Sequence, residues 1–509
     1  MIIERKKNAT RNVFFGVILK IYTLALPFVM RTVLLYLMGV EYLGLNSLFV
    51  SILQVLNLAE LGVGSAMVFA MYKPIVEDDK IKICALMKLY RFYYRIIGSV
   101  VLGAGLLITP FVPKLIKGSV PDSINVYILY LLNLLATVFT YWLFAYRNSI
   151  LTAYQRSDVI SKVSLLTSTI QFVLQFIVLY LTHNYYYYVV VVLLTQILNN
   201  ILIALICKKM YPDYQPVGKL PQNEVSDINH RVKDVFTSKL GGTILNSADT
   251  IVISAFLGLA PLAIYQNYFY VLNAAMGIML VLFSSITAGV GNSLLTESLE
   301  KNYIDFRRTT LITFLVMGVF ISELFSLYQP FMEFWAGKEL MLPNSMVILF
   351  CVYFFDVIYV QLASVYKDAA GIWHQDRYRP LISALTNLVL NLIMVNYWGL
   401  YGILLSTIIS AAFISFPWIT HNLFHLIFKG YFKDYFPRLL YYSLVVLITV
   451  IITGFAGQLI VVNGFLMLIL RAFLVLIVSF LTMALMLFNN KDFRWILDLI
   501  KGIIIKKKS

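Results

Sequence analysis

Seven ionisable side chains lie inside long apolar segments of this chain, where charge is costly. A charged group at the centre of a bilayer costs about 2.5–3.5 kcal/mol on insertion scales, so such groups face a bundle interior or a water-filled cavity. There they can bind or carry a substrate, or they can pair with one another and hold helices together. These residues are Lys20, Arg31, Glu60, Asp249, Glu323, Asp356 and Arg471.

Lys20 and Arg31 form a pair of cations on the first apolar segment. They are eleven residues apart, and at 100° per residue both project from one face of a helix, about 16 Å apart. Pro27 lies on the same face and permits a kink. Two cations along one helix can pass an anion from one depth to another, and the planar guanidinium of Arg31 suits phosphate. We therefore predict that both residues bind an anionic substrate.

Polar residues on two other segments extend this predicted translocation site. Asn57 and Glu60 share one face of the second segment with Gly64, and Asn246 and Asp249 share a face of the seventh. In the alignment of the two halves of the chain, Arg31 corresponds to Thr250, which is next to Asp249. The first half therefore offers cations where the second half offers carboxylates.

Glu323 and Asp356 lie on the ninth and tenth segments. They can carry protons or bind Na⁺ as a coupling ion, or they can neutralise cations across a cavity. No other cofactor is predicted, and the spacing of the cysteines and histidines predicts no metal site. Arg471 lies on an added pair of segments outside the repeated core, so we interpret it as structural.

The composition requires a membrane around these charges. Of 509 residues, 60% are hydrophobic and only 13% are charged, whereas about a quarter of an ordinary soluble protein is charged. Apolar runs long enough to cross ~30 Å of hydrocarbon predict an all-α polytopic membrane protein with about 14 transmembrane helices. We place these helices at 12–38, 45–72, 93–113, 124–146, 160–182, 186–207, 237–258, 262–291, 309–331, 343–366, 380–397, 399–424, 438–459 and 463–488.

The basic excess of the chain follows its predicted topology. There are 40 Lys and Arg against 25 Asp and Glu, yet the odd-numbered connections carry only Lys114, Lys117 and Lys338. Nearly all other basic residues lie at the termini and in even-numbered connections, so the positive-inside rule places both termini in the cytoplasm. The predicted topology therefore accounts for the net positive charge of the chain, and no nucleic acid is predicted as a partner.

An internal repeat relates the first six segments to the next six. Three stretches match in order, at nearly constant spacing and at equivalent topological positions. Because six is even, the two six-helix bundles are parallel and related by a pseudo-two-fold axis along the membrane normal, with a C-terminal helix pair added. The matches are 39–46 with 258–265, 146–156 with 366–376, and Gln171 and Gln175 with Asn387 and Asn391.

The repeat defines five predicted regions. The tail has apolar residues at helical spacing and ends in lysines, which indicates an amphipathic helix on the inner leaflet. The regions are an N-terminal six-helix bundle at 1–207, a cytoplasmic linker at 208–236, a second six-helix bundle at 237–430, an appended helix pair at 431–490 and a basic cytoplasmic tail at 491–509.

Two stretches resemble a known family. They contain Leu43-Gly44-Leu45 followed by Leu58-Ala59-Glu60-Leu61-Gly62-Val63-Gly64-Ser65-Ala66, and Asn387-x3-Asn391 followed by Tyr397-Trp398-Gly399-Leu400-Tyr401-Gly402. There the chain is similar to the Wzx-type polysaccharide transporters of the multidrug/oligosaccharidyl-lipid/polysaccharide exporter superfamily. The resemblance implies a flippase of the bacterial cytoplasmic membrane, which moves a polyprenyl-diphosphate-linked oligosaccharide repeat unit outward by alternating access. It also implies a role in capsule, exopolysaccharide or O-antigen biosynthesis, with polysaccharide polymerase and glycosyltransferases as partners.

Two other transport functions stay open. A multidrug antiporter of the same superfamily would bind cationic drugs at Asp249, Glu323 and Asp356, although Lys20 and Arg31 would repel them. A peptidoglycan-precursor flippase would share the fold and the lipid carrier. An enzyme is not predicted, because a membrane glycosyltransferase or polymerase needs a large extracytoplasmic loop with catalytic carboxylates. The longest outer loops predicted here have only about a dozen residues.

Overall fold

The computed structural model describes residues 5–60, 62–118 and 120–506, and every regular element in these ranges is a helix. This confirms the all-α fold that the long apolar runs predict. A helix satisfies its own backbone hydrogen bonds, which is required in hydrocarbon because no water is available there.

The chain divides into two compact units, Met1–Ala263 and Ile264–Ser509. Short 3-10 turns interrupt or extend several helices of the first unit. Its α-helices are α1 (Arg5–Met38), α2 (Val40–Leu56), α3 (Val63–Val76), α4 (Lys80–Ile108), α5 (Val126–Trp142), α6 (Asn148–Ala153), α7 (Ser157–Thr182), α8 (Tyr185–Met210) and α9 (Gln222–Phe256).

The second unit begins inside a long helix, α10 (Leu259–Thr296), whose first turn belongs to the first unit. The helices that follow are α11 (Leu299–Ala336), α12 (Asn344–Ala369), α13 (Trp373–Asp376), α14 (Arg379–Trp398), α15 (Leu400–Ser410), α16 (Phe416–Asn422), α17 (Phe432–Gln458), α18 (Phe465–Leu487) and α19 (Lys491–Lys506).

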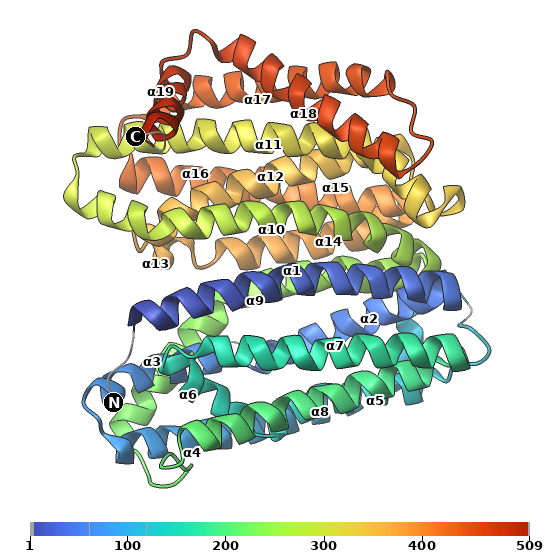
Figure 1. The fold of residues 1–509 in the computed structure, drawn as a ribbon, viewed down its shortest axis with the longest axis vertical. Coiled ribbons are helices and arrows are strands. Elements are labelled where there is room, and N and C mark those ends of the chain that lie inside the picture. The colour runs from blue at the N-terminus through green and yellow to red at the C-terminus, as the bar shows by residue number, and fades with distance from the viewer. Residues whose placement is uncertain (1–4, 61, 119, 507–509) are drawn as a thin grey trace. The chain divides into compact units, whose positions relative to one another are not determined.

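Within the first unit, α7 packs against α1 and α8, and α5 packs against α4 and α8 (Figure 1). The helix α9 contacts α2 and α3, so its contacts group it with the first unit, whereas the internal repeat predicts that 237–258 belongs to the second bundle. The predicted region boundaries and the pseudo-two-fold axis stay predictions.

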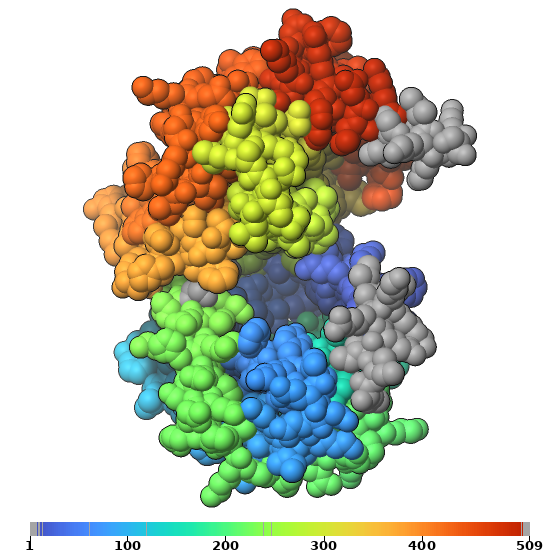
Figure 2. Space-filling model, turned by 90° about the vertical axis from the view of Figure 1, so that its left-hand side faces the viewer, coloured from blue at the N-terminus to red at the C-terminus, as the bar shows by residue number. Residues whose placement is uncertain are grey.

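Within the second unit, α11 lies at the centre of the packing and contacts α12, α17 and α18. The appended helices α17 and α18 also pack against each other. Figure 2 shows the C-terminal segment, coloured red, at the surface of this unit. The appended pair is therefore attached to the second unit mainly through α11.

Among the described residues, twelve helices are long and apolar enough to cross a membrane, or thirteen if the bent pair Val126–Trp142 and Ala145–Ala153 is one span. These coincide with all predicted segments except the seventh, 237–258, so the count of 14 is not confirmed. The seventh segment lies in α9, which is 35 residues long. Its polar residues, among them Lys239 and Asp249, lower its hydropathy.

The second predicted segment, 45–72, is not one continuous helix. It breaks after α2 into a 3-10 turn at Asn57–Glu60, and α3 begins at Val63. Gly62 has a φ of +94°, and a Cβ there would lie 2.9 Å from the carbonyl oxygen of Val232 on α9. Only glycine fits this backbone conformation beside another helix without strain.

The predicted segment 399–424 corresponds to α15 and α16 together with two π-helical turns, Ala411–Ser415 and Leu423–Ile427. A π-helical turn holds one more residue than an α-helical turn because its hydrogen bonds run from i to i+5. Pro417 follows the first of them. Its ring clashes with the carbonyl one α-helical turn back, which explains why the chain widens there.

The connection between α8 and α9 is shorter than the predicted linker 208–236, since only 211–221 is outside the two helices. A cluster of tyrosines fixes it to the first unit. The rings of Tyr154 and Tyr211 stack with their centroids 4.8 Å apart, and the hydroxyls of Tyr154 and Tyr214 are 2.5 Å apart. Burial raises the pKa of Tyr211 to about 12. The linker is therefore a packed element.

The tail forms α19, whose described part ends at Lys506; Lys507 and Lys508 lie outside the described residues. Asp492 is buried, and its carboxylate is 2.6 Å from Nε of Arg307 on α11. The guanidinium of Arg308 lies 4.0 Å from the ring centroid of Trp495. The tail is thus held on α11 by charge, and its position on the inner leaflet stays a prediction.

Candidate functional site

A polar cluster surrounds the break in the second segment. The hydroxyl of Tyr94 donates to Oε1 of Glu60 at 2.8 Å, and the hydroxyl of Tyr90 donates to that of Tyr94 at 2.7 Å. The hydroxyl of Tyr141 donates to Oδ1 of Asn57 at 3.0 Å. Because the rings of Tyr94 and Tyr141 also contact each other, at 5.6 Å between centroids, these five residues form one connected cluster.

The break itself positions Asn57 and Glu60. Both residues belong to the 3-10 turn Asn57–Glu60, and each is partly buried. Gly64 comes close to the cluster, since a Cβ on it would lie 3.1 Å from the Tyr90 hydroxyl and 3.8 Å from Oε1 of Glu60. The structure therefore brings Asn57, Glu60 and Gly64 to the same side, next to the tyrosines. The sequence spacing predicts this grouping for a continuous helix, whereas in the structure a 3-10 turn produces it.

The cations of α1 differ from each other in exposure. Lys20 is exposed, while Arg31 is partly buried, and Arg31 donates from Nη2 to the carbonyl oxygen of Ala263 at 3.3 Å. The helix packs against α7, yet only 11% of its most apolar window is buried. Most of the surface of α1 in this unit is therefore available to lipid or to a substrate.

The predicted acidic position on α9 is Asp249, which is partly buried between the buried residues Ala248 and Thr250. Asn246 also belongs to α9, but its side chain lies outside the described residues.

Glu323 and Asp356 lie on two helices that pack together, α11 and α12. Each side chain is partly buried, and Oε2 of Glu323 and Oδ2 of Asp356 have no hydrogen-bond partner among the described residues. Glu323 also lines a cavity of about 230 Å³ whose other walls are apolar. A buried carboxylate without a partner is costly when ionised, so both groups are suited to binding a proton or a cation.

The amides of the internal repeat lie at equivalent helix pairs. In the first unit, Thr195 on α8 donates to Gln171 on α7 at 3.2 Å. In the second unit, Asn387 on α14 donates to Thr407 on α15 at 2.8 Å, and Ser406 donates to Asn391. The amides therefore join two antiparallel helices in each unit, which is a structural role.

The charges in the apolar segments do not point to Tyr90, Tyr94 and Tyr141, although the structure places these tyrosines around Glu60 and Asn57. The signal that could have found them is the spacing of Tyr90 and Tyr94, which are four residues apart on one face of α4. Among the described residues, no three His, Cys, Asp or Glu side chains lie close enough together to hold a metal ion.

A comparison with protein families identifies one match. Residues 9–288, more than half of the chain, match the family model described as polysaccharide biosynthesis protein. No curated protein matches the sequence.

Several solved structures are similar in fold. The lipid II flippase MurJ, in an inward closed conformation, has a TM-score of 0.68 and 17% identity, and the match covers 94% of this chain and 99% of that chain. An inward-facing multidrug resistance transporter of the MATE family, in the MOP superfamily, has a TM-score of 0.63 and 16% identity, with 80% and 94% covered. A MOP superfamily transporter from Pyrococcus furiosus has a TM-score of 0.51 and 14% identity, with 82% and 96% covered. At these low identities, the TM-scores show a shared fold.

Proposed function

The chain belongs to the polysaccharide biosynthesis protein family, and from this we propose that it is a flippase for a lipid-linked oligosaccharide. Its substrate is a polyprenyl-diphosphate-linked repeat unit, which it moves across the cytoplasmic membrane by alternating access. The product serves the synthesis of a capsule, an exopolysaccharide or an O-antigen, together with glycosyltransferases and a polysaccharide polymerase. In this proposal both termini are cytoplasmic.

The observation that carries the proposal is the pair of cations on α1. A lipid-linked diphosphate is anionic at its centre, polar at its sugars and apolar at its tail. Lys20 and Arg31 lie on a helix that is little buried in its own unit, so the diphosphate can reach them while the tail stays in lipid. The guanidinium of Arg31, which donates to the carbonyl oxygen of Ala263 in the structure, can turn its planar donors to a phosphate that takes the place of this contact, and Lys20 offers a point charge.

The matched variants Arg31→Ala and Arg31→Lys test this assignment. A hydrogen bond to a charged group contributes about 1.5–3 kcal/mol, so we expect Arg31→Ala to lower flipping roughly ten- to a hundredfold. Arg31→Lys keeps the charge without the planar donor pair, and we expect an intermediate loss. The measurement is polymer production, together with the amount of sugar-lipid that accumulates, in cells that lack the native gene. Normal polymer from Arg31→Ala, at wild-type levels of inserted protein, would refute the role of Arg31.

A peptidoglycan-precursor flippase is the second candidate, because the lipid II flippase MurJ shares the fold over 94% of this chain. Both substrates have a polyprenyl diphosphate, so the two functions need the same cations on α1. They differ in the sugar, and the lipid-linked intermediate that accumulates after deletion of the gene distinguishes them. New drug sensitivity without any accumulating sugar-lipid would instead indicate a multidrug antiporter.

We also propose that Glu323 and Asp356 couple transport to H⁺ or Na⁺. Each has a buried carboxylate oxygen without a partner among the described residues, and binding of a cation would remove the cost of that burial. No other cofactor is part of the proposal.

A further inference from the structure

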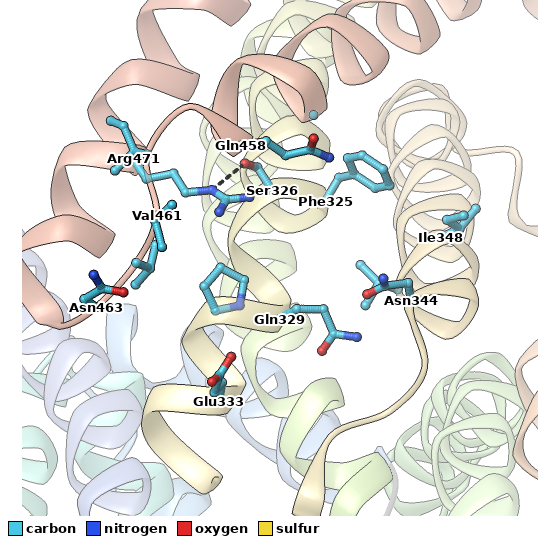
Figure 3. Close-up of a pocket in the computed structure, with 15 residues that line it drawn as sticks. Phe325, Ser326, Gln329, Glu333, Asn344, Ile348, Gln458, Val461, Asn463 and Arg471 are labelled. Atoms are coloured by element: carbon cyan, nitrogen blue, oxygen red, sulfur yellow. Dashed lines mark hydrogen bonds between the residues drawn. The ribbon is translucent and has the colours of Figure 1, made fainter. Parts of the chain in front are cut away.

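A cavity in the second unit lies between the appended pair and the bundle. It has a volume of about 580 Å³ and is lined by α11, α12, α17, α18 and the connection between α17 and α18. Figure 3 shows the polar side chains around it. They include Ser326, Gln329, Glu333, Gln458, Asn463 and Arg471. A cavity with so many hydrogen-bonding groups is suited to a polar ligand, because packing of apolar helices alone would not need them.

Arg471 is the best positioned of these groups. Its Nε donates to Oγ of Ser326 on α11 at 3.2 Å. Gly457 on α17 is in direct contact with this pair, since a Cβ there would overlap Oγ of Ser326 and lie 3.1 Å from Nε of Arg471. A glycine and a serine on two neighbouring helices thus fix the direction of the guanidinium: a Cβ on Gly457 would also lie 3.4 Å from Nη2 of Arg471, and Arg471 itself lines the cavity.

The described residues provide no hydrogen-bond partner for the terminal nitrogens of Arg471. An arginine has five N–H groups, and the described residues provide Arg471 with only the one acceptor on Ser326. No carboxylate among them lies within 4.0 Å of Arg471. The one carboxylate in the cavity wall, Glu333, is already paired with Lys338 at 3.3 Å. The cavity therefore has one uncompensated positive charge.

The surroundings of Arg471 are those of a lipid boundary. It is the seventh residue of α18, which places it roughly 9 Å from the start of that helix. The neighbouring side chains Phe465, Leu466 and Phe473 are exposed and apolar, as expected of a surface in hydrocarbon. The cavity is at the end of α11 opposite Arg307, where α19 packs.

We propose that this cavity binds the phosphate of an anionic membrane lipid. Arg471 holds the phosphate through its two terminal nitrogens, and Gln458 and Asn463 are placed to hydrogen-bond the polar part of the headgroup. The acyl chains lie along the exposed apolar face of α18. The bound phosphate supplies a negative charge next to Arg471, which offsets the free-energy cost of a partly buried guanidinium in the bilayer.

Lipid-dependent thermal unfolding of the purified full chain tests the proposal. In dodecylmaltoside, we expect palmitoyl-oleoyl phosphatidylglycerol to raise Tm more than palmitoyl-oleoyl phosphatidylcholine does. Arg471→Gln should reduce this phosphatidylglycerol preference, and native mass spectrometry should detect one bound phosphatidylglycerol fewer than in the wild type. The apparent Kd for that lipid should rise at least tenfold. Each variant is compared with its own phosphatidylcholine baseline, so a loss of stability does not obscure the result.

Two further variants separate lipid binding from other roles of charge and packing. Lys501→Gln removes an exposed lysine of α19 and should retain the phosphatidylglycerol bound by Arg471. Ser326→Ala removes the one described acceptor and should retain most of the preference. An unchanged preference in Arg471→Gln would overturn the proposal. So would equal losses in Ser326→Ala and Arg471→Gln, because these would assign Arg471 to helix packing. If inorganic phosphate alone gave the same Tm shift, the ligand of the cavity would be a free anion and the lipid proposal would be wrong.

Discussion

At the scale of single residues, four of the seven ionisable groups in the apolar segments fall into three structural classes. Glu60 receives a hydrogen bond from Tyr94, so its charge is stabilised within the first unit. Glu323 and Asp356 each keep one buried oxygen without a partner among the described residues. Arg471 keeps unpaired donors toward a cavity. Residues that look alike in sequence, each a charge in an apolar run, thus differ in what they can bind.

The pair Glu323 and Asp356 gives a prediction about coupling. Glu323→Gln and Asp356→Asn keep the size of each side chain and remove its ability to bind a proton or Na⁺. We expect transport in proteoliposomes to lose its response to an imposed H⁺ or Na⁺ gradient, because the cation no longer has a site. Glu297→Gln is the matched control, since that carboxylate pairs with Lys301 at 2.6 Å at the end of a helix. Transport that still responds fully to the gradient in both variants would exclude them as the coupling site.

The sequence identifies those candidate residues whose placement in a membrane costs much free energy. A charged side chain in an apolar segment is costly, so the sequence around Lys20, Arg31 and Glu60 is enough to identify them as candidates. The tyrosines around Glu60 are not visible in this way, because a tyrosine in a membrane helix is equally stable at the lipid interface. Their role depends on contacts of α4 and α5 with the 3-10 turn Asn57–Glu60, and no local pattern encodes those contacts.

At the scale of elements, the break at Asn57–Glu60 controls the site. It turns the second segment so that α2 and α3 both meet α9, and it holds Asn57 and Glu60 toward the tyrosines. Hydropathy does not reveal this break, because the segment 45–72 is apolar enough on average to be counted as one span. Gly62, with a positive φ, is the residue that makes it feasible.

Gly62→Ala should therefore damage the first unit. Its Cβ would meet the carbonyl of Val232 and the side chain of Val235, each at 2.9 Å, and an alanine with positive φ costs about 1–2 kcal/mol. We expect a loss of stability of about 2 kcal/mol, measured as a lower Tm in detergent. Gly277→Ala on α10 is the control, because nothing lies within 4 Å of its new methyl group. Equal Tm values for the two variants would show that the close approach at Gly62 is unimportant.

At the scale of the whole molecule, the grouping of helices by sequence repeat differs from their grouping by contacts. The sequence repeat predicts that the second bundle begins near 237, but α9 packs on α2 and α3 and is grouped with the first unit. Hydropathy and repeats report which segments are alike. They do not report which helices touch, because tertiary contacts depend on side chains from distant parts of the chain.

A chain cut after Gly218, within the linker, tests the position of α9. We expect the fragments 1–218 and 219–509, expressed together, to purify as one complex in detergent. The reason is that α9 on the second fragment packs against α2 and α3 on the first. The same fragments with Gly62→Ala should associate less well, since that methyl group meets α9. Wild-type fragments that separate on an affinity column would contradict this packing.

The π-helical turns at Ala411–Ser415 and Leu423–Ile427 affect how this chain can be aligned with its relatives. Each turn holds one extra residue, which rotates everything after it by about 100° relative to an uninterrupted α-helix. An ungapped alignment with a relative that has a straight helix would therefore assign lipid-facing positions to the interior in Phe416–Asn422, which follows the first turn. Inferences about conserved faces in this helix require a one-residue gap at the first turn, whereas the second turn comes at the end of the helix.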